Sequence, residues 1–376
     1  MKKLIFRKFL ADAFLSFLLL ITCLSIIVWV IQAVNYLDFV SEDGHGFKVY
    51  FLYTLLNFPK IFSKLFLVSL FISLFYIILK YDDNNELSIY WSLGISKFQF
   101  INKIIIFSFI LVFIQLSIGS YISPKTQNYG KSFIRMSNID FFPSLIKERK
   151  FIDTLSNLTI YVDEQSNDKK KFKNILIKDQ AKDGKVFQII IANDGEIVTK
   201  NKKNYLILKN GEIFSSSNLK DFSNFKFENF EFNLSKFSSK TTVIPKIQEN
   251  KSSNIIKCYL NNNNYKKKFY INEEELRCHK GSSKDIVQEI FKRFALPFYV
   301  PVICLIACML FMNNKFNKLY IINKGIIFIF GFIVIFFSEI MVKYSGINKT
   351  QDLIIFMSPV LLFVIIYLFM LKKNHY

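Results

Sequence analysis

Six long apolar runs dominate the hydrophobic pattern of this 376-residue chain, and a long polar stretch separates the first three from the last three. Each run approaches or exceeds the roughly 20 apolar residues that a helix needs to cross a bilayer. The pattern therefore predicts a membrane protein with six spanning helices and one domain inserted between about Tyr121 and Lys284. The runs are Phe9–Val34, Tyr50–Leu79, Ile104–Ser120, Phe294–Met312, Tyr320–Met341 and Leu353–Leu371.

The inserted stretch contains short runs of strand-forming residues, and several of them alternate apolar and polar positions. Asn193–Gly195 and Asn210-Gly211 have the composition of turns between strands. Many short strands predict an all-β sandwich or jelly roll. The expected strands are Asn157–Val162, Lys173–Lys178, Lys185–Ala192, Tyr205–Lys209 and Phe225–Phe232.

These patterns divide the chain into three parts. Residues 1–122 hold three membrane helices and a short cytoplasmic helix at 82–98, residues 123–284 form the β-domain, and residues 285–376 hold the last three membrane helices. A β-sandwich lined with phenylalanine can carry acyl chains, but an ordinary phenylalanine-rich core has the same composition, and sequence alone favours that ordinary core. The alternating phenylalanines in question are Phe225, Phe227, Phe230 and Phe232.

The distribution of basic residues predicts the orientation in the membrane, because Lys and Arg are enriched in cytoplasmic loops. Lys2, Lys3, Arg7 and Lys8 precede the first run, whereas the loop at 38–48 is net acidic. We therefore expect both termini in the cytoplasm and the inserted domain outside, which is the periplasm of a Gram-negative cell.

The net charge of +20 has two interpretations. It can serve an anionic partner such as lipid head groups, lipopolysaccharide or nucleic acid, or it can reflect a lysine- and asparagine-rich composition without function. Nucleic acid is disfavoured because no known binding motif accompanies the charge. Lys60 and Lys64 follow Pro59 in the second run, where they can snorkel to the interface or face an anionic ligand; Pro59 itself can start or kink that helix.

Cysteine, histidine and glycine patterns limit the chemistry further. Cys258 and Cys278 lie in the polar stretch and can pair if that domain is outside the cytoplasm, although two free thiols are also compatible with the sequence. No spacing resembles a metal site or a catalytic triad, so we expect no cofactor and no enzyme activity. The phosphate-binding glycine-rich loop of ATPases is absent, so the chain itself is not expected to hydrolyse ATP.

The segment Asp82–Phe98 lies between the second and third runs and has helical spacing. An apolar stripe occupies one face of this helix. The residues on another face are Glu86, Ile89, Ser92, Leu93 and Ser96. Such a helix can lie on the membrane surface, or it can couple the spans to a cytoplasmic motor. Physical reasoning alone leaves both open. The stripe consists of Leu87, Tyr90, Trp91, Gly94, Ile95 and Phe98.

The stretch Glu86–Ser96 resembles the coupling-helix motif of the LptF/LptG lipopolysaccharide export permeases, an acidic and apolar start followed by Gly-apolar-Ser. The resemblance covers the whole chain, since the family has three helices, a periplasmic β-jellyroll and three more helices. Glu289–Pro297 looks like the family's start of the fourth helix. Trp29–Val40 and Leu158–Asp179 are more similar to the LptF branch.

The resemblance implies an inner-membrane permease subunit that forms a heterodimer with an LptG-like chain. An LptB-like ATPase dimer would drive it, and an LptC-like bridge would receive the lipopolysaccharide. The implied coupling residues are Glu86, Leu87, Tyr90, Trp91, Gly94, Ile95 and Ser96. Gln32 and Asn35 stand where many relatives carry a basic residue, which leaves phosphate contact to Lys60, Lys64 or Lys343, or to none of them.

Two other classes compete with this interpretation. Permeases of the lipoprotein-releasing or cell-division type place one helix before the external domain and three after it, which the three-plus-three pattern disfavours. A membrane sensor with an external β-domain needs no coupling helix and is expected to carry a cytoplasmic signalling domain.

Overall fold

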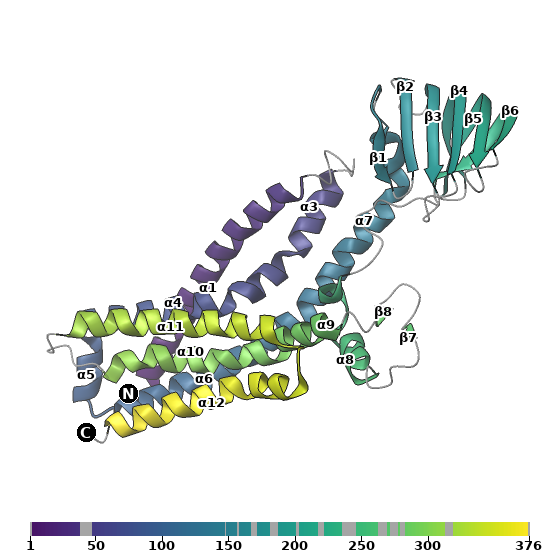
Figure 1. Ribbon diagram of the computed structural model, residues 1–376. Coiled ribbons are helices and arrows are strands. Elements are labelled where there is room, and N and C mark those ends of the chain that lie inside the picture. The colour runs from purple at the N-terminus through teal and green to yellow at the C-terminus, as the bar shows by residue number, and fades with distance from the viewer. Residues whose placement is uncertain are drawn as a thin grey trace. The chain divides into compact units, whose positions relative to one another are not determined.

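The computed structural model describes residues 2–37, 47–146, 148–155, 158–166, 171–180, 187–200, 203–216, 222–234, 246–261, 269–270, 277–278, 283–312 and 319–374 (Figure 1). The chain forms two compact units. The first comprises Met1–Val30, Asn57–Asn128 and Pro245–Tyr376, and the second comprises Ile31–Leu56 and Tyr129–Ile244. The predicted division of the chain after residues 122 and 284 stays a prediction.

Six helical stretches are long and apolar enough to cross a membrane, which confirms the six predicted spans. They are Lys3–Asn35, Phe47–Asp83, Lys97–Ile134, Ser283–Met312, Tyr320–Tyr344 and Thr350–Lys372.

The helices of the first half are α1 (Lys2–Asn35), α3 (Phe47–Leu56), α4 (Phe58–Asp83), α5 (Glu86–Ser92), α6 (Lys97–Ser117), the π-helix η1 (Ile118–Ile122) and α7 (Ser123–Leu145). The second half contains η3 (Ile247–Glu249), α8 (Ser252–Asn261), α9 (Ser283–Ile290), the π-helix η5 (Phe291–Ala295), η6 (Leu296–Phe298), α10 (Tyr299–Cys308), η7 (Met309–Met312), α11 (Tyr320–Tyr344) and α12 (Lys349–Asn374). Pro59 lies in the first turn of α4, where its missing N–H costs nothing, so it starts this helix.

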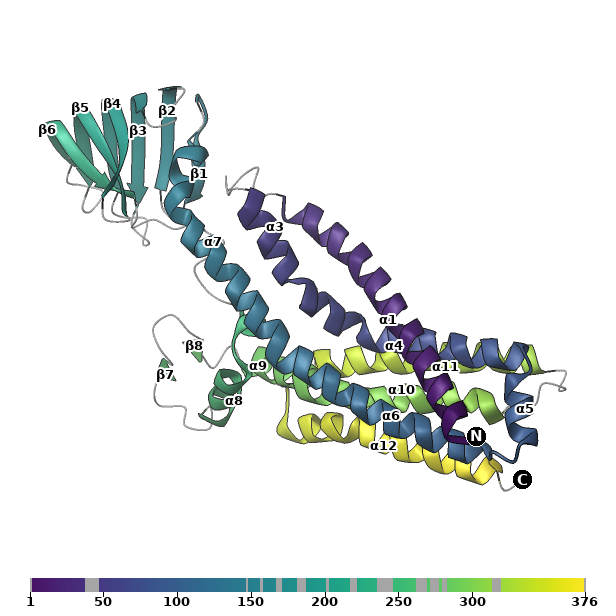
Figure 2. The same cartoon turned by 180° about the vertical axis from the view of Figure 1, so that it is seen from behind.

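The helix α10 forms the centre of the first unit. Every residue of α10 is buried, as expected for a segment that is apolar on all sides. It packs against α4, α6, α11 and α12, and both views draw it between α11 and α6 (Figures 1 and 2). By contrast, only 17% of the apolar window of α1 is buried, so α1 lies at the periphery of this unit.

Six antiparallel strands form one sheet in the second unit, which confirms the predicted inserted β-domain. The strand order follows the sequence, so each strand pairs with the next one along the chain (Figure 1). The strands are β1 (Ile152–Leu155), β2 (Leu158–Gln165), β3 (Lys171–Gln180), β4 (Phe187–Lys200), β5 (Lys203–Ser216) and β6 (Phe222–Asn233). Two short strands, β7 (Phe269–Tyr270) and β8 (Arg277–Cys278), pair separately.

The two predicted turns are wrong, because Asn193–Gly195 lies within β4 and Asn210-Gly211 lies within β5. Ala192 pairs with Gly211 and Asp194 pairs with Lys209, while the residues between them are skipped. The same break in pairing occurs at the equivalent position of the neighbouring strand pairs, and the register is the same on both sides of the break. We call these positions the bend row: Asp163, Asn174, Asn193, Asn210 and Glu228.

Backbone conformation explains why turn-forming residues occupy the bend row. Asn174 and Asn210 have φ angles of 50° and 51°, a left-handed conformation that asparagine tolerates better than most residues. A Cβ atom at Gly211 would overlap the carbonyl oxygen of Ile191, so only glycine fits beside the bend. The Asn-Gly pair therefore bends a long strand instead of ending a short one.

The bend keeps the apolar side chains on one face of the sheet. Phe172 and Ile175 are both buried although they are three residues apart, because the bend between them resets the alternation. Buried residues from both sides of the bend row consequently share one core. Its members include Ile160, Ile177, Ile190 and Ile213 on one side, and Ile197, Leu206, Leu208 and Phe232 on the other.

Candidate functional site

The predicted cytoplasmic helix is shorter than residues 82–98. The helix α5 covers only Glu86–Ser92, since Asn85 before it and Gly94 after it adopt left-handed backbone with φ angles of 61° and 74°. Ser96 then caps α6, where its side chain accepts a hydrogen bond from the backbone N–H of Gln99 at 3.2 Å. The segment is therefore a compact loop–helix–loop between α4 and α6.

The apolar stripe of this segment faces the protein's own core. Leu87, Tyr90 and Ile95 are buried, and the half-buried Trp91 packs edge-on against Phe100 at a centroid distance of 5.8 Å. These four predicted coupling residues, Leu87, Tyr90, Trp91 and Ile95, anchor the segment and do not form the surface that a partner would meet. These side chains therefore hold α5 in place.

The exposed side of α5 and of its C-cap residue Leu93 contains two large apolar residues that were not among the predicted coupling residues. Ile89 is 55% exposed and Leu93 is 53% exposed, and Gly94 and Ser96 are exposed beside them. The only sequence signal was that Ile89 and Leu93 turn away from the apolar stripe. A pair of exposed apolar side chains on a short anchored helix is a candidate partner contact. We call Ile89 and Leu93, together with Ser88 and Ser92, the outer face of α5.

Glu86 lies at the start of α5 and is in contact with two side chains. The Tyr90 hydroxyl donates a hydrogen bond to the Glu86 carboxylate at 3.3 Å, and the Lys8 ammonium lies 3.9 Å from it. Burial raises the pKa of Tyr90, and the nearby Glu86 charge raises this pKa further. Glu86 thus connects α5 to the first turns of α1.

The predicted phosphate contacts fall into two sets. Lys60 and Lys64 lie one turn apart on α4, where Lys60 is half-buried and Lys64 is exposed. Lys60 interacts electrostatically with three nearby charged side chains, which are Lys64, Glu249 and Glu289. Gln32 and Asn35 belong to the other compact unit. The structure therefore places the two lysines on one helix of the first unit, and each set is considered by itself.

Arg293 joins the start of the fourth span to the chain that precedes α8. Its side chain is only 3% exposed and donates to the Glu289 carboxylate at 2.8 Å, to the carbonyl oxygens of Asn250 and Gln248 at 2.9 Å, and to Ser252 Oγ at 2.9 Å. Glu289 and Arg293 are one helical turn apart, whereas the other three contacts join residues more than 40 positions apart.

Ser252 extends this set of contacts to the third span. Its hydroxyl donates to the carbonyl oxygen of Ser120 at 2.5 Å. Ser120 lies in the π-helix η1 and Arg293 lies in the π-helix η5, so both π-helices meet at Ser252. We call Ser120, Ser252, Glu289 and Arg293 the polar knot.

The four predicted phenylalanines of β6, from Phe225 to Phe232, lie on one face of the sheet. They pair in register with Ile213, Gly211, Leu208 and Leu206 of β5, and the three apolar partners belong to the core of the sheet. The aromatic rings of Phe227 and Phe230 are 5.4 Å apart across the bend row, Phe232 is buried, and Phe225 is 61% exposed. The predicted lipid-contacting residues Phe225, Phe227, Phe230 and Phe232 therefore form a continuous apolar row whose first member is open to a ligand.

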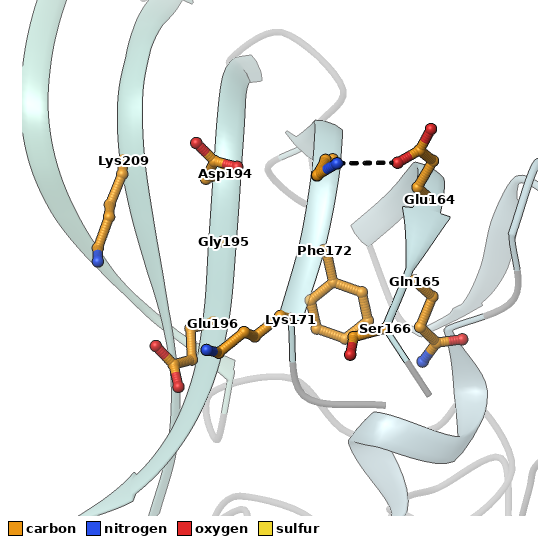
Figure 3. A pocket seen from close by; sticks show the side chains of 10 residues that line it. Glu164, Gln165, Ser166, Lys171, Phe172, Asp194, Gly195, Glu196 and Lys209 are labelled. Carbon is orange, nitrogen blue, oxygen red and sulfur yellow. Dashed lines mark hydrogen bonds and ion pairs between the residues drawn. The ribbon is translucent and has the colours of Figure 1, made fainter. Parts of the chain in front are cut away.

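A separate pocket of about 530 Å³ lies in the same sheet, and none of the predicted site residues lines it (Figure 3). Glu164, Lys173, Asp194 and Lys209 occupy neighbouring strands and alternate in charge. Lys173 and Glu164 form an ion pair at 3.2 Å (Figure 3). Such a charged wall does not suit acyl chains, so the phenylalanine row is the better lipid candidate.

Two observations concern cysteine and metal chemistry. Cys258 in α8 is disulfide-bonded, whereas Cys23, Cys304 and Cys308 are free thiols. The remaining cysteine is Cys278, whose side chain lies outside the described residues, so these states support the predicted pair. Within the described part of the chain, no group of three His, Cys, Asp or Glu residues is arranged to hold a metal ion.

Six spans, an inserted antiparallel β-domain and a short helix anchored between the second and third spans define a multi-pass membrane protein. A family model for the lipopolysaccharide export system permease LptF/LptG matches residues 7–373. The chain therefore belongs to this family and is a lipopolysaccharide export permease of the inner membrane. The match does not separate LptF from LptG, so the LptF branch stays a prediction. No curated protein matches the chain in a direct comparison.

Proposed function

We propose that this chain is the LptF-like subunit of an ABC transporter that extracts lipopolysaccharide from the inner membrane. The observation that carries the proposal is the family match over residues 7–373, nearly the entire chain. In this proposal an LptG-like permease forms the other half of a heterodimer. A separate LptB-like ATPase dimer supplies the energy, and an LptC-like membrane-anchored bridge receives the lipid. Both termini face the cytoplasm, and the β-domain faces the periplasm.

The ATPase contact in this proposal is the outer face of α5. Ile89 and Leu93 are more than half exposed, while the buried side chains beneath them fix the position of the helix. An apolar pair of this kind gains free energy when a protein groove covers it, by roughly 25 cal/mol per Å² of apolar surface removed from water. Glu86 holds the start of α5 in the correct position, and Gly94 and Ser96 shape the exit from it.

Replacing Ile89 or Leu93 by aspartate tests the ATPase contact. We expect either variant to lose most of the ATPase that co-purifies with the permease, because a carboxylate would be buried in an apolar groove. Leu4→Asp is the matched control, since Leu4 is a 69% exposed leucine near the start of α1. If α5 lay on the lipid surface instead, the α5 variants would keep normal ATPase co-purification, which contradicts the proposal.

Glu86→Lys is expected to weaken co-purification or to uncouple hydrolysis from transport.

The lipid path in this proposal ends at the phenylalanine row of β6. Acyl chains pack well against aromatic rings, and the row is continuous across the bend row with Phe225 open to solvent. Phosphate groups of the lipid are assigned to Lys60 and Lys64 of the first unit, and Gln32 and Asn35 of the second unit are kept only as separate, neutral hydrogen-bonding candidates. Ammonium groups bind phosphate more strongly than amides do, so the two lysines carry most of this contact.

A photo-reactive amino acid at Phe225 tests the lipid path. We expect an adduct with lipopolysaccharide that depends on ATP when the complete transporter is embedded in membranes. Phe214 is the matched control, because it is an exposed phenylalanine on the opposite face of the neighbouring strand. Absence of an adduct at both Phe225 and Phe230, with a probe at Lys64 reacting normally, would show that the β-domain is only a scaffold.

A further inference from the structure

The first span carries an acidic residue inside its apolar run. Asp12 lies in α1, and its carboxylate accepts a hydrogen bond from the Tyr81 hydroxyl of α4 at 2.5 Å. Ionisable residues within spans are costly, and those that persist commonly serve a function with a definable partner. Tyr81 is only 3% exposed, so this bond lies within the packed first unit.

The remainder of α1 is attached to this unit mainly through apolar side chains. Phe9, Ala13, Phe17 and Ile21 are its buried apolar residues, whereas Ile26, Ile27 and Val30 are each about half exposed. Apolar contacts of this kind allow one helix to slide or rotate against another, because they have little directional preference. A hydrogen bond to a carboxylate is directional and fixes the position of α1 relative to α4.

The ring of Tyr81 also contacts α5. Its centroid lies 6.3 Å from that of Tyr90, whose hydroxyl in turn donates to Glu86, and 5.2 Å from that of Phe9 in α1. Both views place the N-terminal end of α1 at the end of the bundle where α5 lies (Figures 1 and 2). Tyr81 therefore touches the anchored side of α5 with its ring and holds α1 with its hydroxyl.

A second link between α1 and α5 is weaker. Lys8 and Glu86 are 3.9 Å apart, and their side chains are 64% and 30% exposed. Exposed ion pairs of this kind contribute little free energy, since water and salt screen them. The part-buried bond between Asp12 and Tyr81 is thus stronger than this ion pair.

We propose that the Asp12–Tyr81 hydrogen bond is a positioning contact that passes the displacement of α5 to the first span. When the ATPase moves α5, the ring of Tyr81 follows and its hydroxyl moves Asp12 and α1 with it. The inference rests on the proposed ATPase-driven function, but it assigns the link to two residues outside the proposed ATPase contact and the proposed lipid path. Without this hydrogen bond, α5 and α1 would move independently, and hydrolysis would continue without efficient extraction.

Tyr81→Phe in the complete transporter tests the proposal, because this change removes the hydroxyl and keeps the ring. We expect assembly and the rate of ATP hydrolysis to stay normal, while the lipopolysaccharide released per ATP falls about tenfold, the order expected for one hydrogen bond to a charged group. Asp12→Ala should behave likewise, whereas Asp12→Asn keeps an acceptor oxygen and should restore most of the release. Tyr76→Phe is the matched control, since Tyr76 is a 55% exposed tyrosine on the same helix.

Each outcome decides the proposal. Normal release per ATP by Tyr81→Phe would overturn it. A parallel loss of assembly, hydrolysis and release would also overturn it, because the bond would then serve only to hold the fold. Equal defects in Asp12→Asn and Asp12→Ala would show that the acceptor oxygen is irrelevant. If the unmodified transporter itself released no lipopolysaccharide, the proposed function would fail independently of these variants.

Discussion

Replacing Arg293 by methionine should destabilise the membrane unit strongly. The guanidinium group makes four hydrogen bonds of 2.8 to 2.9 Å, and its side chain is 3% exposed. Methionine is similar to arginine in length, but it is apolar and cannot donate a hydrogen bond. The Glu289 carboxylate, which is 15% exposed, would therefore lose its partner. Breaking a buried ion pair by removing one partner typically costs about 3–5 kcal/mol.

The carbonyl oxygens of Gln248 and Asn250 add to this cost if water does not reach them, at about 1–3 kcal/mol for each orphaned group. They lie near the end of a span, where hydration offsets part of that loss. We therefore expect the Arg293→Met variant to lose about 3–5 kcal/mol of unfolding free energy. Arg293→Lys keeps the charge but replaces the planar fork by a single ammonium, so it should recover only part of the loss.

The measurement is equilibrium unfolding of the purified protein in lipid nanodiscs. Lys292→Met is the matched control, because Lys292 is the exposed neighbour in the same π-helix, and its free energy should change by less than about 0.5 kcal/mol. A Glu289→Gln variant completes a double-mutant cycle that isolates the ion pair. An Arg293→Met variant as stable as the Lys292→Met control would refute the view that the polar knot holds the two spans together.

Three further changes test packing, backbone conformation and the disulfide. Gly331→Ala places a methyl group in the ring of Phe71 and should cost about 1–3 kcal/mol of unfolding free energy, which Phe71→Leu in the same chain should partly relieve. Asn210→Ala should destabilise the β-domain by about 1–2 kcal/mol because its φ angle is 51°, while Asn210→Gly should be close to neutral; unfolding followed by a probe in the sheet separates the two. Cys258 should appear linked to Cys278 in non-reducing peptide mapping, and complete labelling of both thiols without reductant would exclude the pair.

The six spans could be predicted from sequence because a bilayer demands a fixed length of apolar helix, and that demand is local. The orientation of α5 could not be predicted with the same security. Leu87 and Tyr90 form a helical stripe in either case, and only the tertiary fold decides whether that stripe meets a partner or the protein's own core. The exposed pair Ile89 and Leu93 was consequently overlooked.

Local chemistry also misled the prediction of the β-domain. Asparagine followed by glycine favours left-handed backbone whether the strand ends there or bends there, and Asn210 shows this conformation in the middle of β5. Only pairing with residues far along the chain tells the two cases apart. The contacts of Arg293 likewise include a local and a distant set. Glu289 is one helical turn away and can be inferred from the sequence, whereas Gln248 and Ser252 are more than 40 residues away and cannot.

The complete burial of α10 has a consequence for biosynthesis. This helix packs on α4 and α6, which are made before it, and on α11 and α12, which are made after it. Until the last two spans are inserted, one side of α10 must face lipid, and its apolar character on all sides makes that temporary state tolerable. Enclosure of α10 is therefore a late event of assembly, and a nascent chain that stops before Tyr320 would still expose to lipid the side that α11 and α12 finally cover.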